Sequence, residues 1–559
     1  MPLEDPIQAL QAICRRFGRE AAARKHALLD EIEALDAIPV EDLLLLHDTL
    51  DFLRAYPDDA RLRRRVERMG SGLRRYVPGL RGGADAPRLR DTGFPGAINR
   101  YPYAYQVLRR LARRFPTCLE IDWEAFEADE TLAAMIELLL TPAENEGMED
   151  LTSGWHDWIQ TCKSSPSESD LEFLLRLFER SDLGELQQAN LYESCVLPLR
   201  YELKEPGSAR CEVEFPGTRV HYQRSDIPRD RFALEPEIRR PIEHVAPLSP
   251  NVAEDVIGRC LAALCSRNLE IYPLIWASPR DVTIYECERG IRIVLVGVPS
   301  RHRLLLGSMY LFLVIKNGVP IAYGPASPFA GCCEMGINLF PEFRGGEIRY
   351  VFSQVMRILH HVLGVEYFYL TPYGMGVGNE DAIRTGAFWF YRNMGFRCTN
   401  PRVEDLAREE EERMRRERGH RSSTRTLRRL SRTGAFLDLS EGRCRPLRFG
   451  DLGQLVSRFV AREFDGDRRL AYRACTTRVR RALGIRSLRV WTEAERMLLE
   501  RLSLILALIP DLGTWRPTEK RALVAIVRAK AARSEARAAR LLARHSRLET
   551  ALRTLLAEL

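Results

Sequence analysis

The segment from Gly331 to Arg397 most constrains how this chain of 559 residues can fold. Short apolar runs typical of buried strands alternate in it with longer runs whose apolar residues recur at helical spacing, and glycine-containing turns lie between them. The predicted order is strand, glycine turn, amphipathic helix, buried strand, glycine-rich loop and second helix. This is the alternation of an α/β layer, and we expect a site where it turns.

The first of these turns is suited to binding an anion. Pro341 ends the apolar run Met335–Phe340, and Arg344-Gly345-Gly346 then leads into the long helix. The first backbone N–H groups of a helix have no partner within it and lie at the positive end of its dipole. A phosphate group is therefore the expected ligand.

The same turn resembles the pyrophosphate loop of the GNAT superfamily of acyl-CoA-dependent N-acyltransferases. The family pattern is Gln/Arg-x-x-Gly-x-Gly/Ala between the fourth strand and the third helix, and this chain has Arg344-Gly345-Gly346-Glu347-Ile348-Arg349. The strand, the first arginine and the helix agree with the pattern. Glu347 stands where the family has glycine, and Arg349 stands where it has glycine or alanine. A carboxylate that faces a pyrophosphate repels it unless the side chain turns away.

A second stretch, Ala387–Phe396, is similar to the last helix and turn of the same family. The family pattern Ala-x-x-x-Tyr-x-x-x-Gly-Phe is matched at all four fixed positions. The resemblance implies that Tyr391 is the general acid that protonates the departing thiolate of coenzyme A. The alternative is that Tyr391 belongs to the core, because it ends an aromatic run that begins at Phe388.

The resemblance assigns the other roles of an amine acylation site. Glu334, on the strand before the turn, is placed to accept the proton of the amine, although a single glutamate at a strand edge is also typical of a solvated or paired carboxylate. Backbone N–H groups near Leu339 and Phe340 would stabilise the oxyanion. The implied cofactor is acetyl-CoA or another acyl-CoA, and its pyrophosphate would be held by Arg344, Gly345, Gly346 and Arg349.

Upstream of the turn, a helix that follows Pro250 precedes five predicted strands: Val282–Cys287, Ile291–Val296, Tyr310–Ile315, Val319–Tyr323 and Cys333–Leu339. Asn317-Gly318 between the third and fourth is a strong hairpin signal. A helix, an antiparallel meander and a strand-helix-strand unit follow the order of the GNAT fold. We therefore expect an α/β (α+β) protein with a GNAT-like mixed central sheet and helices on both faces.

The predicted domains are a helical region at 1–90, a mostly helical domain with minor strands at 97–245, the GNAT-like domain at 246–400, a charged helix with a basic linker at 401–445, and a helical region at 446–559.

Composition narrows the class of protein. Hydrophobic residues make up 45% and charged residues 29% of the chain, which is typical of a folded globular protein. The sequence contains no apolar run of 18 residues and no secretory signal, so we predict a cytoplasmic protein without a membrane span. The 13 cysteines include no C-x-x-C pair, so we expect reduced thiols and no metal site.

The net charge of +7 equals that of the last 44 residues, because Arg516 to Leu559 contain 11 Lys and Arg against 4 Glu. A heptad-like repeat predicts one final helix, with its apolar seam at Ala538, Leu541, His545, Leu548, Leu552, Leu555 and Leu559. Two interpretations remain open: a helical hairpin or coiled coil that allows self-association, and a basic helix that binds nucleic acid.

Three functions are consistent with these patterns. The first is a transferase that moves an acyl group from acyl-CoA to a small-molecule or peptide amine. The second is a catalytically inactive GNAT-like scaffold, which Glu347 and Arg349 favour. The third is association with nucleic acid through the basic C-terminal helix.

Overall fold

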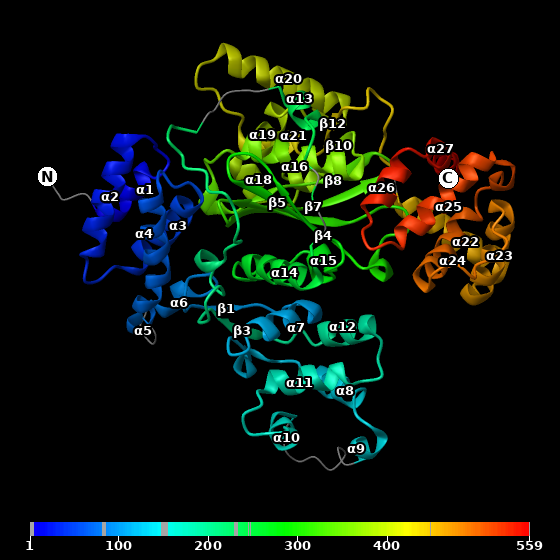
Figure 1. Cartoon of the computed structure of the whole chain (residues 1–559), viewed down its shortest axis with the longest axis horizontal. Helices are drawn as coiled ribbons and strands as arrows, with labels where there is room; N and C mark the ends of the chain where they lie inside the picture. Colours follow the sequence, from blue (N-terminus) through cyan, green and yellow to red (C-terminus); the bar gives the residue numbers. More distant parts are fainter. Residues whose placement is uncertain are drawn as a thin grey trace.

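The computed structural model describes residues 5–80, 85–146, 155–227, 233–243, 245, 248–447 and 449–557. A central sheet lies between helices, with one helical region at each end of the molecule and a further small domain on the lower side (Figure 1).

The central sheet is built from nine strands: β4 Val282–Glu286, β5 Ile291–Gly297, β6 Tyr310–Lys316, β7 Val319–Phe329, β8 Cys332–Met335, β9 Asn338–Leu339, β10 Tyr367–Leu370, β11 Arg397–Cys398 and β12 Ala435–Asp438. Their order is β11-β12-β10-β8-β7-β6-β5-β4, and β9 pairs with β7. Strands β8 and β10 run parallel, whereas the other pairs are antiparallel. The first four predicted strands are confirmed as β4 to β7, whereas the fifth, predicted as Cys333–Leu339, is divided into β8 and β9 by Gly336 and Ile337.

The hairpin between β6 and β7 turns at the predicted Asn-Gly pair. Asn317 has a φ of 52° and Gly318 a φ of 89°, the positive values that a two-residue turn of the hairpin type requires. The Asn317 side chain also donates to the carbonyl oxygens of Ala55 and His221, at 2.8 and 2.9 Å. This turn therefore fastens two distant segments to the sheet.

Helices cover both faces of the sheet (Figure 1). On one side lie α14 Pro250–Cys265 and α15 Tyr272–Ile275. On the other side lie α13 Leu234–Arg239, α16 Ile348–Leu363, α17 Pro372–Met375, α18 Glu380–Thr385, α19 Ala387–Asn393, α20 Pro401–Arg416 and α21 Thr424–Leu430. Helix α16 is the long amphipathic helix predicted from the sequence, and it ends at Gly364, whose φ of 73° is that of a left-handed cap.

The sheet continues beyond residue 400. Strands β11 and β12 pair with each other, and β12 also pairs with β10, so that β12 lies inside the sheet. The segment 401–445, predicted as a charged helix and basic linker, thus contributes a strand as well as α20 and α21. Four residues, Ala435–Asp438, are too short a pattern to predict a pairing of such long range.

The N-terminal region consists of helices α1 Pro6–Ile13, α2 Arg19–Glu33, α3 Val40–Ala55, α4 Ala60–Gly72, α5 Val77–Leu80 and α6 Ala86–Leu89. The small domain contains β1 Ile98–Arg100, α7 Tyr105–Arg114, β2 Leu119–Ile121, α8 Asp129–Glu137, α9 Pro142–Glu146, α10 Trp155–Cys162, α11 Asp170–Glu179, α12 Glu185–Ser194 and β3 Leu199–Glu202. Its three strands form a separate antiparallel sheet in the order β1-β3-β2.

The C-terminal region contains α22 Phe449–Phe464, α23 Arg468–Leu483, α24 Glu493–Leu506, α25 Pro517–Lys530, α26 Ala536–Ala543 and α27 Ser546–Ala557. These helices form most of a second hydrophobic core, to which Leu306, Phe329 and Ala330 of the central domain also contribute, while Ala539 of α26 belongs to the first core.

The single final helix predicted from the heptad repeat is wrong. The chain bends between α26 and α27, where Nδ1 of His545 accepts a hydrogen bond from the Leu548 backbone N–H at 3.1 Å and so caps α27. The predicted seam residues Ala538, Leu548 and Leu552 are buried inside the domain.

The structure is therefore mixed α/β, as predicted. Among the helices that the structure describes, none combines the length and the apolar character needed to cross a membrane.

Candidate functional site

The predicted anion site at the start of α16 is closed by an ion pair. The Glu347 carboxylate lies 2.5 Å from Nζ of Lys316, which is fully buried at the end of β6, and 3.1 Å from Nη1 of Arg289. Burial lowers the pKa of Lys316, and the charge of Glu347 opposes that shift. The carboxylate that stands at the family's glycine position thus neutralises cations of this chain.

Side chains of the N-terminal region cover the same turn. Tyr56, the residue after α3, is 1% exposed, and a Cβ at Gly346 would lie 2.6 Å from its hydroxyl oxygen. Arg15 donates from Nε to the Arg344 carbonyl oxygen at 2.9 Å. Burial raises the pKa of Tyr56, the charge of Glu347 raises it further, and a hydrogen bond from the Glu347 backbone opposes these shifts. The space where a pyrophosphate would approach α16 holds protein atoms.

The two arginines predicted to hold pyrophosphate point to other partners. Arg344 donates from Nη2 to Oδ2 of Asp381 at 2.7 Å, and Arg349 donates from Nη1 to the Asn393 carbonyl oxygen at 3.1 Å. Both contacts link the start of α16 to the segment that contains α18 and α19. Arg344, Gly345, Gly346 and Arg349 thus lie at one helix end, but the two arginine side chains are engaged with Asp381 and Asn393.

Strands β8 and β10 separate just before this turn. They pair from Cys332 to Glu334 only, and β9 then pairs with β7 alone. Gly336 and Ile337 interrupt the pairing with β7, which resumes in the same register at β9. The backbone of β7 comes close to this break, because a Cβ at Gly324 would lie 2.0 Å from the Gly336 carbonyl oxygen.

Tyr391 lies at this point of separation. Its ring is 4% exposed and packs edge-on against Phe352, Phe390 and Phe396, with centroid distances of 5.8, 5.1 and 5.8 Å. Burial raises its pKa to about 12, and a hydrogen bond from the Ile337 backbone opposes the shift. The hydroxyl group and the N–H of Ile337, which lies in the link between β8 and β9, therefore meet beside an aromatic cluster.

The remaining predicted residues lie on the same strands. Glu334 is exposed and accepts a hydrogen bond from the Tyr369 hydroxyl at 3.1 Å. Leu339 is half-buried on β9. Phe340 is buried, stacks on Tyr323 and lies under the guanidinium of Arg267, 4.0 Å from its carbon.

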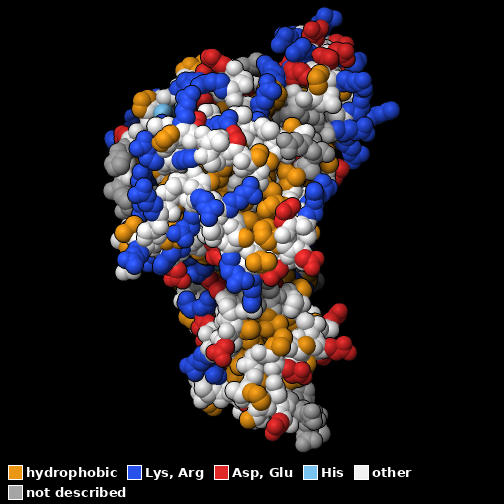
Figure 2. Space-filling view, turned by 90° about the vertical axis from the view of Figure 1, so that its right-hand side faces the viewer, with side chains coloured by type: hydrophobic (Ala, Val, Ile, Leu, Met, Phe, Trp, Pro, Cys, Tyr) orange, Lys and Arg blue, Asp and Glu red, His pale blue; other side chains and the backbone are white. Residues whose placement is uncertain are grey.

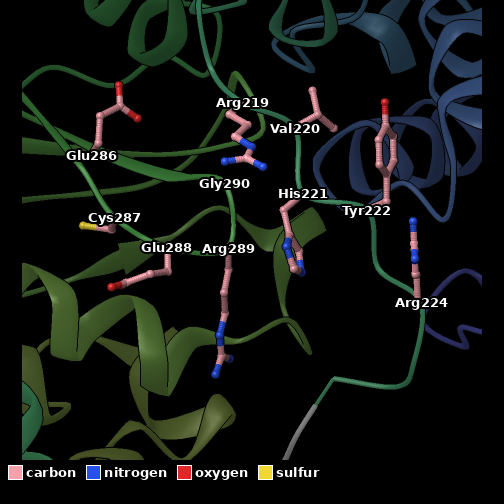
Figure 3. A pocket seen from close by; sticks show the side chains of 10 residues that line it. All are labelled: Arg219, Val220, His221, Tyr222, Arg224, Glu286, Cys287, Glu288, Arg289 and Gly290. Atoms are coloured by element: carbon pink, nitrogen blue, oxygen red, sulfur yellow. The ribbon is translucent and has the colours of Figure 1, made fainter.

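A cavity of about 530 Å³ lies between the turn that joins β4 to β5 and the segment 219–224 (Figure 3). Its lining includes Arg219, Arg224 and Arg289. These three side chains point in different directions in Figure 3, and Arg289 also binds Glu347. Glu286 and Glu288 also line the cavity, so its charge is mixed and its arginines do not converge on one point.

Sequence reasoning missed Lys316, Tyr56, Arg15 and Arg289. Lys316 follows the apolar run of β6 and precedes a tight turn, a position where lysine is normally solvated. Within the described part of the chain, no group of three or more His, Cys, Asp or Glu side chains is placed to hold a metal ion.

Comparison with family models, with curated proteins and with solved structures gives no match. The functional argument therefore depends on the geometry of this chain.

Proposed function

We propose that the central domain is a GNAT-like scaffold that holds two helical regions in place and does not use acyl-CoA. The observation that carries the proposal is the closed end of α16, where Glu347, Lys316 and Tyr56 fill the position of the family's pyrophosphate. A bound diphosphate would have to displace a buried ion pair, and an uncompensated buried charge is costly.

The contacts at the two ends of α16 support a scaffold. Arg15 and Tyr56, from the N-terminal region, meet the turn before its first residue. At the opposite end, Arg540 of α26 donates to the Val362 carbonyl oxygen at 2.7 Å. A cation at a helix C-terminus complements the dipole. Each end of α16 is therefore in contact with a different flanking region, as expected of a scaffold.

Acyl transfer is the second candidate, and the meeting of Tyr391 with the Ile337 backbone favours it. A phenol and a backbone N–H at one point are the groups needed to protonate a thiolate and to stabilise an oxyanion. The arrangement of helix, antiparallel meander and parallel β8–α16–β10 unit also agrees with the family's order.

One experiment separates the two candidates. We expect the purified full chain to show no calorimetric binding of acetyl-CoA or longer acyl-CoAs, and no release of coenzyme A with a mixture of amines. Tyr391→Phe should leave these results unchanged and should lower the unfolding free energy by about 1 kcal/mol, because the Ile337 N–H loses its partner.

Turnover of acyl-CoA by the wild-type chain would contradict the scaffold. If Tyr391→Phe then lowered that turnover by about 10²-fold or more, as expected for a lost general acid, acyl transfer would replace it.

A further inference from the structure

The C-terminal region, residues 446–559, has an excess of positive charge. It contains 24 Lys and Arg against 12 Asp and Glu. Figure 2 views the molecule from the side of this region and shows Lys and Arg side chains spread over that face, with fewer Asp and Glu among them. Lys and Arg side chains of this region are therefore exposed at the surface. The ion pairs show which helices carry positive charges that no described carboxylate of the chain neutralises.

The last three helices use much of their charge internally. Their ion pairs are Arg528 with Glu495, Lys530 with Glu535, Arg547 with Asp511, and Arg553 with Glu549. Arg540 binds a carbonyl oxygen of α16. Arg516, Arg521, Arg537 and Arg544 are exposed and form no ion pair with a described residue. The basic tail that the sequence pointed to thus commits only part of its charge to internal contacts.

Helix α23 is different. It buries one stripe, formed by Ala471, Cys475, Val479 and Leu483, and its sequence contains no acidic residue. Its arginines Arg468, Arg469, Arg473, Arg478 and Arg481 are exposed. None of these five forms an ion pair with any residue for which the structure gives a position.

A groove of about 400 Å³ runs beside this helix, between α23, the end of α24 and the start of α25. Arg478, Arg481 and Lys520 are its cationic lining residues, and Lys520 is held by a hydrogen bond from Nζ to the Gly513 carbonyl oxygen at 2.6 Å. The apolar lining consists of Val479, Ala482, Leu506, Ile509 and Leu512. The cationic residues could bind the phosphates of a nucleic acid, while the apolar residues beside them could contact its sugars and bases.

High arginine content alone does not explain this surface. Helix α20 is also rich in arginine, but there Arg408, Arg413 and Arg416 each pair with a glutamate four residues away. Three of the five arginines of α20 are thus paired, whereas none of the five exposed arginines of α23 is paired with a carboxylate that the structure describes, and this contrast indicates that α23 is available to an external polyanion.

We propose that α23 and the adjoining groove bind the phosphodiester backbone of nucleic acid without base specificity. Charge complementarity carries the choice of partner, because arginines that neutralise phosphates release counterions. A membrane surface is less suited to this face: the exposed apolar residues Leu470 and Val490 are single side chains, whereas an interfacial helix needs a continuous apolar face.

The test uses the full chain, a fluorescent 20-base-pair DNA duplex and a single-stranded RNA of equal length, with anisotropy measured at 50 and 200 mM NaCl. We expect binding that weakens as salt increases. The variant Arg473→Gln/Arg478→Gln/Arg481→Gln should lose about tenfold or more in affinity, and its salt slope on duplex should fall by about three. The two nucleic acids show whether the site prefers a duplex or a single strand.

The matched control is Arg408→Gln/Arg413→Gln/Arg416→Gln on α20, which removes the same charge and should change affinity less than about twofold. Circular dichroism of both variants checks the fold, and the single variant Arg473→Glu, on the exposed face, repeats the test with a smaller change. Three results would overturn the proposal: no binding at 50 mM NaCl, equal losses in both triple variants, or binding to anionic phosphatidylserine vesicles without binding to either nucleic acid.

Discussion

Lys316→Met should lower the unfolding free energy of the central domain by about 3–5 kcal/mol, because it leaves the Glu347 carboxylate without its buried partner. Lys316 also donates to the Arg289 carbonyl oxygen at 2.6 Å, and this contact is lost as well. Arg289 is 39% exposed and remains 3.1 Å from Glu347, so it compensates only in part. Urea titration followed by tryptophan fluorescence and by circular dichroism measures the loss.

The pH dependence of this variant identifies the cause. An unpaired buried carboxylate has a raised pKa in the folded state, so it costs stability above that pKa and the cost disappears as the pH falls through it. The difference between wild type and Lys316→Met should therefore shrink from pH 8 to pH 5. The double variant Lys316→Met/Glu347→Gln removes both charges and should recover much of the loss. A loss that is the same at both pH values and in the double variant would show that the ion pair is not its source.

Arg303→Met should detach the C-terminal region from the central domain. The Arg303 side chain is 1% exposed. It donates to the carbonyl oxygens of Lys530, Ala532 and Arg533, at 2.5, 2.7 and 3.1 Å, in the loop between α25 and α26. It also donates to Oδ2 of Asp281 at 3.3 Å.

Removing this guanidinium leaves three carbonyl groups and the Asp281 carboxylate with fewer partners in a buried interface. We expect a loss of about 3–5 kcal/mol in the urea transition that includes this interface. We also expect faster trypsin cleavage within residues 530–536, because this loop would open more often. Because most of the second hydrophobic core comes from the C-terminal helices, this region should then unfold in a transition of its own.

Arg533→Met is the matched control. Arg533 lies on the same loop but is exposed, and it donates to the Arg280 and Leu248 carbonyl oxygens at 3.2 and 3.1 Å. Its loss should cost less than about 1 kcal/mol. Equal effects of the two substitutions would contradict a special role of Arg303.

Lysine use shows how far composition can be interpreted. The chain has 6 Lys among 84 Lys and Arg residues, a bias that suggests nothing about structure by itself. In the fold, Lys25, Lys316 and Lys530 are at most 1% exposed, and each pairs with a carboxylate: Asp58, Glu347 and Glu535. Each of these pairs except the last joins residues more than 30 positions apart. Local patterns give no information on such pairs.

The sequence by itself determined the strands of the central meander, the Asn-Gly turn, the amphipathic helix α16 and the glycine turn before it. These features depend on side-chain periodicity and on backbone freedom, which act within a few residues. The sequence also predicted that Tyr391 and Arg344 belong to the same acyl-CoA site. Only the tertiary structure decided that Lys316, Tyr56 and Arg15 lie at the helix end, that β12 enters the sheet, and that the exposed arginines of α23 lie beside an apolar groove. Those outcomes depend on which distant side chains meet and exclude water. Contacts of that kind produce no periodic pattern in the sequence.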